Sequence, residues 1–344
     1  MKASVKREDG KVWIENVPTL GWGTGRECTF AGALEAATAV TERPCKYSDL
    51  MGWSSLAFRL RWYHGDTGQR WCPSSPVGEF PDEIAALQKA TGWELRPVLD
   101  GGHMDRHASE IVSSIDAGLP VLAYEPRLNV DVIYGYQDGG QTLLMRDYFR
   151  GPEPLVLPPR ELGFLAIFLG EHRAGLSAHD GLIEGLKIAA TNWRRGSAPA
   201  ERGKYWHGDA AYAKWIDDSR DVSPLTKEER DLLFFVGHWN FCSLADARAA
   251  AAAFLKENAP LLSDEARGAV LRAAALYETE GELLGRAFRD KDAFLGMWSG
   301  KTIGDWTDAV RARERQILSE ARATEADAIA EIEKALAAEG AGPG

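Results

Sequence analysis

The chain has 344 residues, of which 45% are hydrophobic, and it carries a formal net charge of −11. This length exceeds one typical domain and predicts two, each large enough to bury a normal core. The acidic balance argues against general binding of nucleic acid or of anionic membranes. No run of the sequence approaches the ~20 apolar residues that a membrane-spanning helix needs.

The first half of the chain mixes helix and strand patterns. Glycine and proline delimit segments of helical spacing, which predict helices at residues 28–40, 81–91 and 108–117, a partly helical stretch at 47–63 and a loop at 73–81. Apolar or alternating segments predict strands at residues 11–16, 93–99, 119–124, 130–136, 142–148 and 163–169. A hairpin turn at residues 137–140 joins two of these strands. Antiparallel strands after a helical start indicate an α+β domain rather than a doubly wound sheet.

Beyond about residue 175 only helix patterns are found. Helices are expected at residues 182–194, 208–217, 227–242, 244–258, 263–288 and 306–338. The sequence therefore predicts an α+β domain at residues 1–172, an all-α domain at residues 173–338 and a disordered tail at residues 339–344.

The four cysteines, Cys28, Cys45, Cys72 and Cys242, form no CxxC pair. Their spacing fits neither a zinc site nor a disulfide framework. The first ten residues are polar and contain no apolar signal segment. We therefore expect a reduced, cytoplasmic protein that uses no metal ion and no other cofactor.

Cys28 is the first candidate for chemistry. A glycine-rich stretch at residues 21–25 leads into an Ala-rich helix, and the thiol lies at the junction. The free amide groups and partial positive charge of a helix start favour an anion such as a thiolate, which makes a cysteine there more reactive. A small buried residue at the start of a core helix explains the same pattern, and the sequence does not decide between the two.

A cysteine nucleophile needs a base and a group that orients the base. His103 and His107 follow Gly101-Gly102 in the expected first domain, so either is a candidate base. No spacing argument requires it, and a solvated loop or a helix cap is the plainer interpretation of both histidines.

Asp131 is unusual because it lies within the apolar strand expected at residues 130–136. Strand alternation places it on one face with Ile133 and Gly135. A carboxylate inside an apolar face is costly unless it is paired or protonated, which favours a site residue over a strand-edge residue that reaches water. Asp147 ends the next strand and is either an orienting group or a turn residue paired with Arg146 or Arg150.

The order of these segments along the chain resembles that of the papain-like superfamily of cysteine peptidases. The resemblance is to the branch that contains the butirosin-biosynthesis protein H N-terminal family and the C39-like peptidases. It rests on residues 23–37 with Cys28, residues 118–122, the strand at 130–136, the hairpin glycines Gly139 and Gly140, Asp147, and the string 208–216 in a helical appendage.

The resemblance implies a role for individual residues. Cys28 matches the nucleophile and Asp147 the orienting Asn or Asp, while Asp131 stands where the family has its histidine. Residues 17–27 contain no glutamine for the family's oxyanion hole, and Trp22 or Thr24 stands near that place. Because an aspartate stands at the histidine position, the matched positions do not contain the standard Cys–His pair. An ionised carboxylate next to a thiol also disfavours the thiolate.

Two functions follow from the resemblance. The first is an acyl-transfer enzyme, either a biosynthetic acyltransferase or an amide or peptide hydrolase. Cys28 would attack a small-molecule, peptide or carrier-bound acyl group, with the N–H groups of the helix start holding the oxyanion. The second is an inactive relative that binds a small cationic or peptide ligand. In both, we expect the site to be lined by Trp22, Thr24, Glu27, His103 and His107 around Cys28, Asp131 and Asp147. A third alternative is a scaffold whose helical half forms a homodimer.

Overall fold

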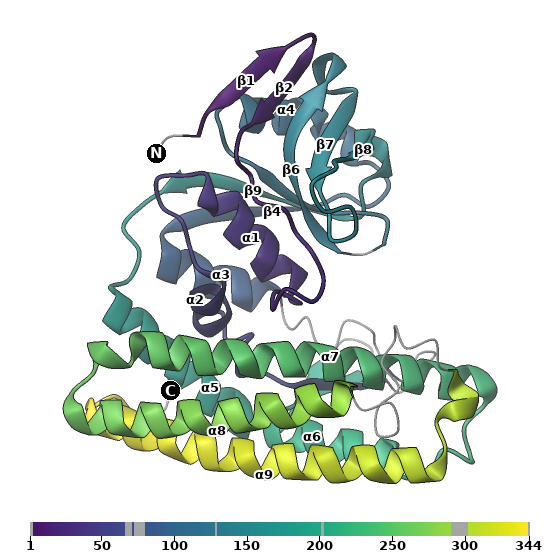
Figure 1. Cartoon of the computed structure of the whole chain (residues 1–344), viewed down its shortest axis with the longest axis vertical. Helices are drawn as coiled ribbons and strands as arrows, with labels where there is room; N and C mark the ends of the chain where they lie inside the picture. Colours follow the sequence, from purple (N-terminus) through teal and green to yellow (C-terminus); the bar gives the residue numbers. More distant parts are fainter. Residues whose placement is uncertain are drawn as a thin grey trace. The chain divides into compact units, whose positions relative to one another are not determined.

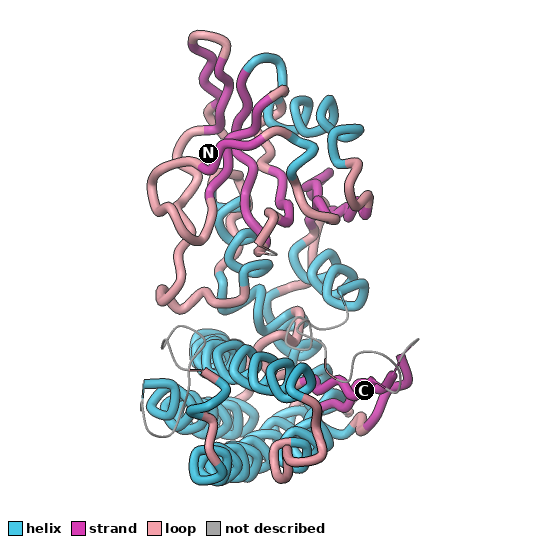
Figure 2. The backbone as a smooth tube through the Cα atoms, turned by 90° about the vertical axis from the view of Figure 1, so that its right-hand side faces the viewer, coloured by secondary structure: helices cyan, strands magenta, loops and turns pink. Residues whose placement is uncertain are grey.

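The computed structural model describes residues 3–65, 71, 80–127, 129–200, 203–289 and 302–342. The chain divides into two compact units (Figure 1). Unit 1 comprises Met1–Leu50 and Ile84–Leu176, and unit 2 comprises Met51–Glu83 and Ser177–Gly344. Strands predominate in the described part of unit 1 and helices in that of unit 2 (Figure 2).

Unit 1 contains an antiparallel sheet of eight strands among the described residues. The strands are β1 (Val5–Glu8), β2 (Lys11–Ile14), β4 (Trp93–Leu99), β5 (Val121–Tyr124), β6 (Val130–Gln137), β7 (Thr142–Arg146), β8 (Leu155–Leu157) and β9 (Leu165–His172). Six follow the order β1-β2-β6-β5-β9-β4, while β7 pairs with β6 and β8. The register places β5 and then β2 along one edge of β6, and β7 along the other. All residues of β6 except the last are buried.

The helices of the first half are α1 (Thr29–Ala39), α2 (Tyr47–Trp53), α3 (Phe80–Thr91) and α4 (Ala108–Asp116), with short turns η1 (Met104–His107), η2 (Asp138–Gly140) and η3 (Pro159–Glu161). The mixed helix and antiparallel sheet confirm the α+β class of the first half. Helix α1 packs against β5 and β6. Its many small residues permit a close approach, and a Cβ at Gly32 would overlap the hydroxyl of Tyr148. The loop expected at residues 73–81 falls largely outside the described residues.

Unit 2 consists mainly of the helices α5 (Ala178–Arg194), α6 (Gly208–Asp218), α7 (Lys227–Asn258), α8 (Asp264–Arg289) and α9 (Asp308–Ala338), with η4 (Ala259–Leu261) and η5 (Ile303–Asp305). The long helices α7, α8 and α9 run side by side (Figure 1). Two separate helices were expected within residues 227–258, but Ser243 does not interrupt α7. The capping box of Thr226 and Glu229 fixes the start of this helix.

The sequence predicts an all-α second domain, but the second unit is not all helical. Strands β10 (Ser197–Ala200), β11 (Gly203–His207) and β3 (Arg61–Gly65) form a three-stranded antiparallel sheet in that order. The pairing of β3 with β11 draws residues 51–83 into unit 2, whereas the sequence assigns them to the first domain. The expected boundary at residue 172 lies close to the observed division after Leu176.

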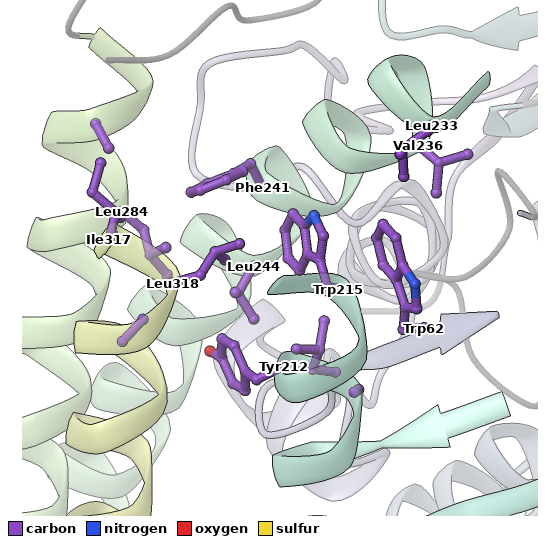
Figure 3. Close-up of a cluster of buried hydrophobic side chains, with 14 of the residues drawn as sticks. Trp62, Tyr212, Trp215, Leu233, Val236, Phe241, Leu244, Leu284, Ile317 and Leu318 are labelled. Carbon is purple, nitrogen blue, oxygen red and sulfur yellow. The ribbon is translucent and has the colours of Figure 1, made fainter. Parts of the chain in front are cut away.

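Aromatic side chains form the core that holds this segment in unit 2 (Figure 3). Trp62 stacks on Trp215 with ring centroids 5.1 Å apart. The indole N–H groups of Trp62 and Trp71 both donate to one carboxylate oxygen of Asp218, at 2.8 and 3.0 Å. Both indoles are fully buried, and burial of a large aromatic side chain stabilises a fold by roughly 2–3 kcal/mol. This core therefore anchors a stretch that residues 84–176, all part of unit 1, separate in sequence from the rest of unit 2.

The C-terminal end of α9 is ordered past the point where the sequence predicts a disordered tail. Gly340 takes a positive φ of 68°, and the N–H of Ala341 donates to the carbonyl of Leu336 at 2.8 Å, as in a Schellman cap. Glu339 accepts from the N–H of Ser263 at 2.8 Å. Residues 343 and 344 lie outside the described residues. Throughout the described ranges, none of the helices has a stretch long and apolar enough to cross a membrane.

Candidate functional site

Cys28 is the N-cap residue of α1, one residue before the helix proper. Its backbone is extended, at φ −78° and ψ 97°, and its side chain makes no capping hydrogen bond. The residue is half-buried. Its carbonyl accepts from the N–H of Gly32 at 2.9 Å, whereas its own N–H donates to the hydroxyl of Tyr47 at 3.0 Å. The amide that the sequence assigns to the oxyanion hole is therefore already bonded.

The start of α1 is fixed against the sheet at two points. The hydroxyl oxygen of Thr29 accepts from the N–H of Val130, the first residue of β6, at 3.1 Å. The hydroxyl of Tyr148 lies 3.3 Å from the carbonyl of Arg26 and donates to it. The structure therefore brings the helix that carries Cys28 to the end of the strand that carries Asp131.

Asp131 and Asp147 occupy neighbouring positions on adjacent strands. Val132 of β6 pairs with Arg146 of β7, and the same antiparallel register continued by one residue places Asp147 opposite Asp131. Residues directly opposite in an antiparallel pair share a face of the sheet. On its other side Asp131 pairs with Ala123 of β5. The two aspartates that the sequence singled out are therefore cross-strand neighbours.

The side chain of Asp131 is completely buried, and neither of its oxygens has a hydrogen-bond partner among the described residues. Burial, reinforced by the negative charges of Glu125 and Asp147, raises the pKa of Asp131 to about 9. The opposing charges of Arg127 and Arg150 offset only part of this rise. Asp131 is therefore a neutral carboxylic acid at pH 7 and is not a base for Cys28.

Asp147 is also buried but remains ionised. Burial alone would raise its pKa, but hydrogen bonds lower the pKa of Asp147 below the ordinary value. One of its oxygens accepts from the N–H groups of Phe149 and Arg150 at 3.2 and 2.8 Å. The other accepts from the guanidinium groups of Arg127 and Arg150 at 2.9 and 2.6 Å. The site therefore holds one neutral and one charged aspartate. Their charge states differ because Asp147 accepts hydrogen bonds and Asp131 has none among the described residues.

Sequence reasoning did not find the third acid of this cluster. Glu125 is buried and accepts from Nε of Arg127 at 2.9 Å and from the side-chain amide of Asn129 at 3.0 Å. The guanidinium of Arg127 also lies over the ring of Phe149, 3.8 Å from its centroid. A charged residue directly after the apolar strand β5, with an arginine two positions later, is the signal that could have indicated this pair.

Three residues of the loop before α1 were expected to line the site. Trp22 contacts the segment that follows Asp147: its ring centroid lies 4.9 Å from that of Tyr148 and 6.3 Å from that of Phe149. Thr24 and Glu27 have bonds within the loop instead. The hydroxyl of Thr24 donates to the carbonyl of Gly21, and Glu27 accepts from the N–H of Gly23, both at 2.7 Å.

The two candidate base histidines make their contacts within residues 100–110, and none of these contacts is with Asp131 or Asp147. His103 is exposed and occupies the N-cap position of the short turn η1, without a capping hydrogen bond from its side chain. The ring of His107 bonds with Asp100 at 3.2 Å and faces Glu110 at 3.7 Å. These contacts account for His107 within its own segment and give it no part in the cluster around Asp131.

Tyr124 is the titratable neighbour of Cys28 that the sequence did not indicate. Burial, with a smaller contribution from the charge of Cys28, raises the pKa of Tyr124 to about 12. Its ring stacks on that of Phe164 with centroids 4.8 Å apart. Tyr124 is therefore a neutral phenol within electrostatic reach of the thiol.

The other cysteines provide a contrast. Burial raises the pKa of Cys45 to about 11, and its sulfur lies 3.8 Å from the carbonyl of Arg43. Cys242 is half-buried, and Cys72 lies outside the described residues. In the described part of the chain, no three His, Cys, Asp or Glu side chains are grouped so as to hold a metal ion. No protein-family model matches this chain, and no curated protein matches it in sequence.

Proposed function

We propose that unit 1 is a papain-like cysteine acyl-transfer domain in which Cys28 is the nucleophile. Its substrate would be a thioester, ester or amide of a small molecule or peptide, which makes the protein a biosynthetic acyltransferase or an amide hydrolase. The observation that carries the proposal is the hydrogen bond from Val130 to Thr29 at 3.1 Å, because it joins the head of the Cys28 helix to the strand of Asp131.

The cross-strand placement of Asp131 and Asp147 supports the same proposal. In the papain-like arrangement the base and its orienting group lie on neighbouring strands that face the cysteine helix. In this proposal Asp131 takes the place of the base and Asp147 that of the orienting group, and their cross-strand register supports it. Because Asp131 is neutral, it does not repel a thiolate as an ionised carboxylate would.

The neutral aspartate changes the chemical step. Cys28 loses its proton to water, and the thiolate attacks the acyl carbonyl carbon. A carbon–sulfur bond forms and the bond to the leaving group breaks, so that the leaving group takes a proton from water and departs as a thiol, alcohol or amine, and an acyl-cysteine remains. An amine or water then attacks the acyl carbon, loses its proton to solvent and releases the thiolate, which yields the amide or the acid. Since the N–H of Cys28 donates to Tyr47, an oxyanion must displace that hydroxyl or take donors other than this amide.

The same bond favours a second candidate, an inactive relative that only binds a ligand. The N–H of Cys28 is occupied by Tyr47, and buried Asp131 is neutral, so neither group is ready to take part in acyl transfer. In this candidate Asp131 would ionise to hold a small cationic or peptide ligand, and one proton would be released on binding.

Alkylation of the thiols separates the two candidates. The native protein is treated with iodoacetamide at pH 7, and the labelled peptides are quantified over time. The first candidate predicts that Cys28 reacts well ahead of Cys45, Cys72 and Cys242, because a helix start favours the thiolate. Cys45 is the internal control, since burial raises its pKa to about 11. Slow labelling at the same rate on all four would overturn the nucleophile and leave the binding candidate.

Restoring the family's histidine is the matched variant. If Asp131 stands at the position of the base, Asp131→His places an imidazole next to the sulfur and accelerates alkylation of Cys28. Circular dichroism verifies that the variant is folded. A folded variant with no acceleration would show that residues 28 and 131 do not act as a pair.

A further inference from the structure

Two arginines are held rigidly at the edge of the candidate site. Arg127 is fixed by Glu125 through Nε, by Asp147 through Nη2 and by the ring of Phe149. Arg150 is fixed by Asp147 through Nη1, while its own N–H bonds the other oxygen of the same carboxylate. Both guanidinium groups therefore converge on one carboxylate oxygen, Asp147 Oδ2.

The charges of this cluster are separated between the interior and the surface. The side chains of Glu125 and Asp147 are at most 1% exposed, whereas those of Arg127 and Arg150 are each 44% exposed. The buried carboxylates thus hold the two arginines from the interior side, while part of each guanidinium group is exposed to solvent. Asp131, which is neutral at pH 7, adds no negative charge to the cluster.

Unused donors remain on the exposed side. Arg127 Nη1, and Nε and Nη2 of Arg150, have no acceptor within the part of the chain that the structure describes. Planar guanidinium donors match the geometry of carboxylate and phosphate oxygens. Because the two side chains are already fixed, binding an anion would cost little of their conformational entropy.

The pair lies at the same end of α1 as Cys28. The guanidinium of Arg127 lies over the ring of Phe149, and this ring contacts Trp22 of the loop before Cys28. The next residue back along the chain, Tyr148, bonds the carbonyl of Arg26. An anion held by the arginines would therefore lie next to the loop that leads to the thiol.

We propose that Arg127 and Arg150 form a binding site for a carboxylate or phosphate group of the ligand that unit 1 takes. This inference rests on the proposed function in one respect, since it places the charged part of the ligand next to Cys28. It restricts the substrate to acyl compounds that carry an oxyanion, and it excludes purely cationic ligands from this position.

A pair of alkylating reagents tests the inference. Iodoacetate is an anion and iodoacetamide is its neutral counterpart, and the two react with a thiol by the same displacement of iodide. The ratio of their rates at Cys28, divided by the same ratio at Cys242, measures the local preference for an anion. We expect the normalised ratio of the iodoacetate rate to the iodoacetamide rate to be at least about three at low ionic strength. Since salt screens the attraction of the anion, the ratio should fall towards one as salt is added.

Variants assign the preference to the two arginines. Arg150→Gln should bring the normalised ratio close to one, and Arg150→Lys should retain part of the preference. Arg127→Gln should act in the same direction, but it also removes a partner from buried Glu125, so its fold is verified first. Arg160→Gln is the matched control, because this exposed arginine of η3 has the same charge and belongs to the same unit. An unchanged ratio in folded Arg150→Gln would overturn the inference.

Competing anions identify the source of the oxyanion. Inorganic phosphate and succinate are titrated separately against the alkylation of Cys28 by iodoacetate, and the more effective competitor distinguishes phosphate from carboxylate. Calorimetric titration of both anions into Cys28→Ser protein measures the site without the thiol. Binding there that is lost in Arg150→Gln supports the anion site even if Cys28 proves unreactive. Absence of binding of either anion to the unmodified protein would overturn the inference while leaving the nucleophile untouched.

Discussion

The hydroxyl of Thr29 accepts a hydrogen bond from the main-chain N–H of Val130 at 3.1 Å. Thr29 is the first residue of α1 and Val130 is the first residue of β6. Cys28 directly precedes one of these residues, and Asp131 directly follows the other. One bond therefore links two segments about a hundred positions apart, next to each of the two candidate residues.

Removal of this bond should loosen the helix start. Thr29→Val keeps the shape of the side chain but leaves the N–H of nearly buried Val130 without its acceptor. An unsatisfied buried N–H costs about 1–3 kcal/mol, so we expect a loss of that size in the free energy of unfolding. Urea denaturation measures it, and Thr29→Ser, which retains the acceptor, is the control. Equal stability of the Val and Ser variants would show that the bond does not hold the helix.

Replacement of Asp131 by asparagine should stabilise the protein above pH 4. Burial raises the pKa of Asp131 from 3.8 to about 9, so the folded state keeps a proton that the unfolded state has lost throughout this range. The wild type therefore loses stability progressively as pH rises from 4 towards 9. Asp131→Asn carries no such charge, and its advantage should grow from pH 5 to pH 8.

Denaturation curves of both proteins at several pH values measure this difference. The outcome that contradicts the protonated state of Asp131 is a stability difference that stays constant over the range. A histidine substitution at the same position is unsuitable for this test, because its own titration falls in the window.

Asp147→Asn should have the opposite effect. The ionised carboxylate accepts four hydrogen bonds, from Phe149, Arg127 and Arg150. Because the pKa of Asp147 is lowered, its contribution is present above the ordinary pKa of an aspartate and is lost as pH falls through the folded value. We expect a loss of about 2–4 kcal/mol at pH 7 that shrinks in acid, measured by urea denaturation at pH 7 and pH 3. A loss of the same size at both pH values would argue against an ionised Asp147.

The close approach of α1 to Tyr148 gives a double-variant test. Gly32→Ala places a methyl group where the hydroxyl of Tyr148 lies, which should destabilise the protein by about 1–3 kcal/mol. Tyr148→Phe removes that hydroxyl, so the double variant should recover much of the loss. Strictly additive losses in the double variant would show that the two residues do not touch.

Local patterns in the sequence were enough to single out the candidate residues. Cys28 was singled out because a glycine-rich stretch meets an Ala-rich helix, and Asp131 because it interrupts an apolar strand. The sequence also predicted the turn at residues 137–140 that joins β6 and β7, whereas the position of Asp147 opposite Asp131 comes from the register of the two strands. Each of the features that singled out a residue or predicted the turn is determined by residues that are close together in the sequence.

The remainder depends on contacts that no local pattern reveals. Arg127 follows strand β5 and joins buried Glu125 to Asp147. Neither Glu125 nor Arg127 was singled out from the sequence, because the contact between Arg127 and Asp147 links two separate segments of the chain. His103 and His107 were candidates only because histidine is the usual base, and their nearest acids could not be foreseen. The burial of Trp62 in unit 2 arises from the pairing of β3 with β11, across more than a hundred residues.

Formation of an acyl-cysteine tests the central proposal most directly. The native protein is incubated with a simple acyl thioester of N-acetylcysteamine, and the modified peptides are mapped by mass spectrometry. We predict one acyl group on Cys28 that hydroxylamine removes, no acyl group on Cys45, and no modification of that site in Cys28→Ser protein. Folded protein that acquires no acyl group on Cys28, or acquires it equally on Cys45, would contradict the proposal.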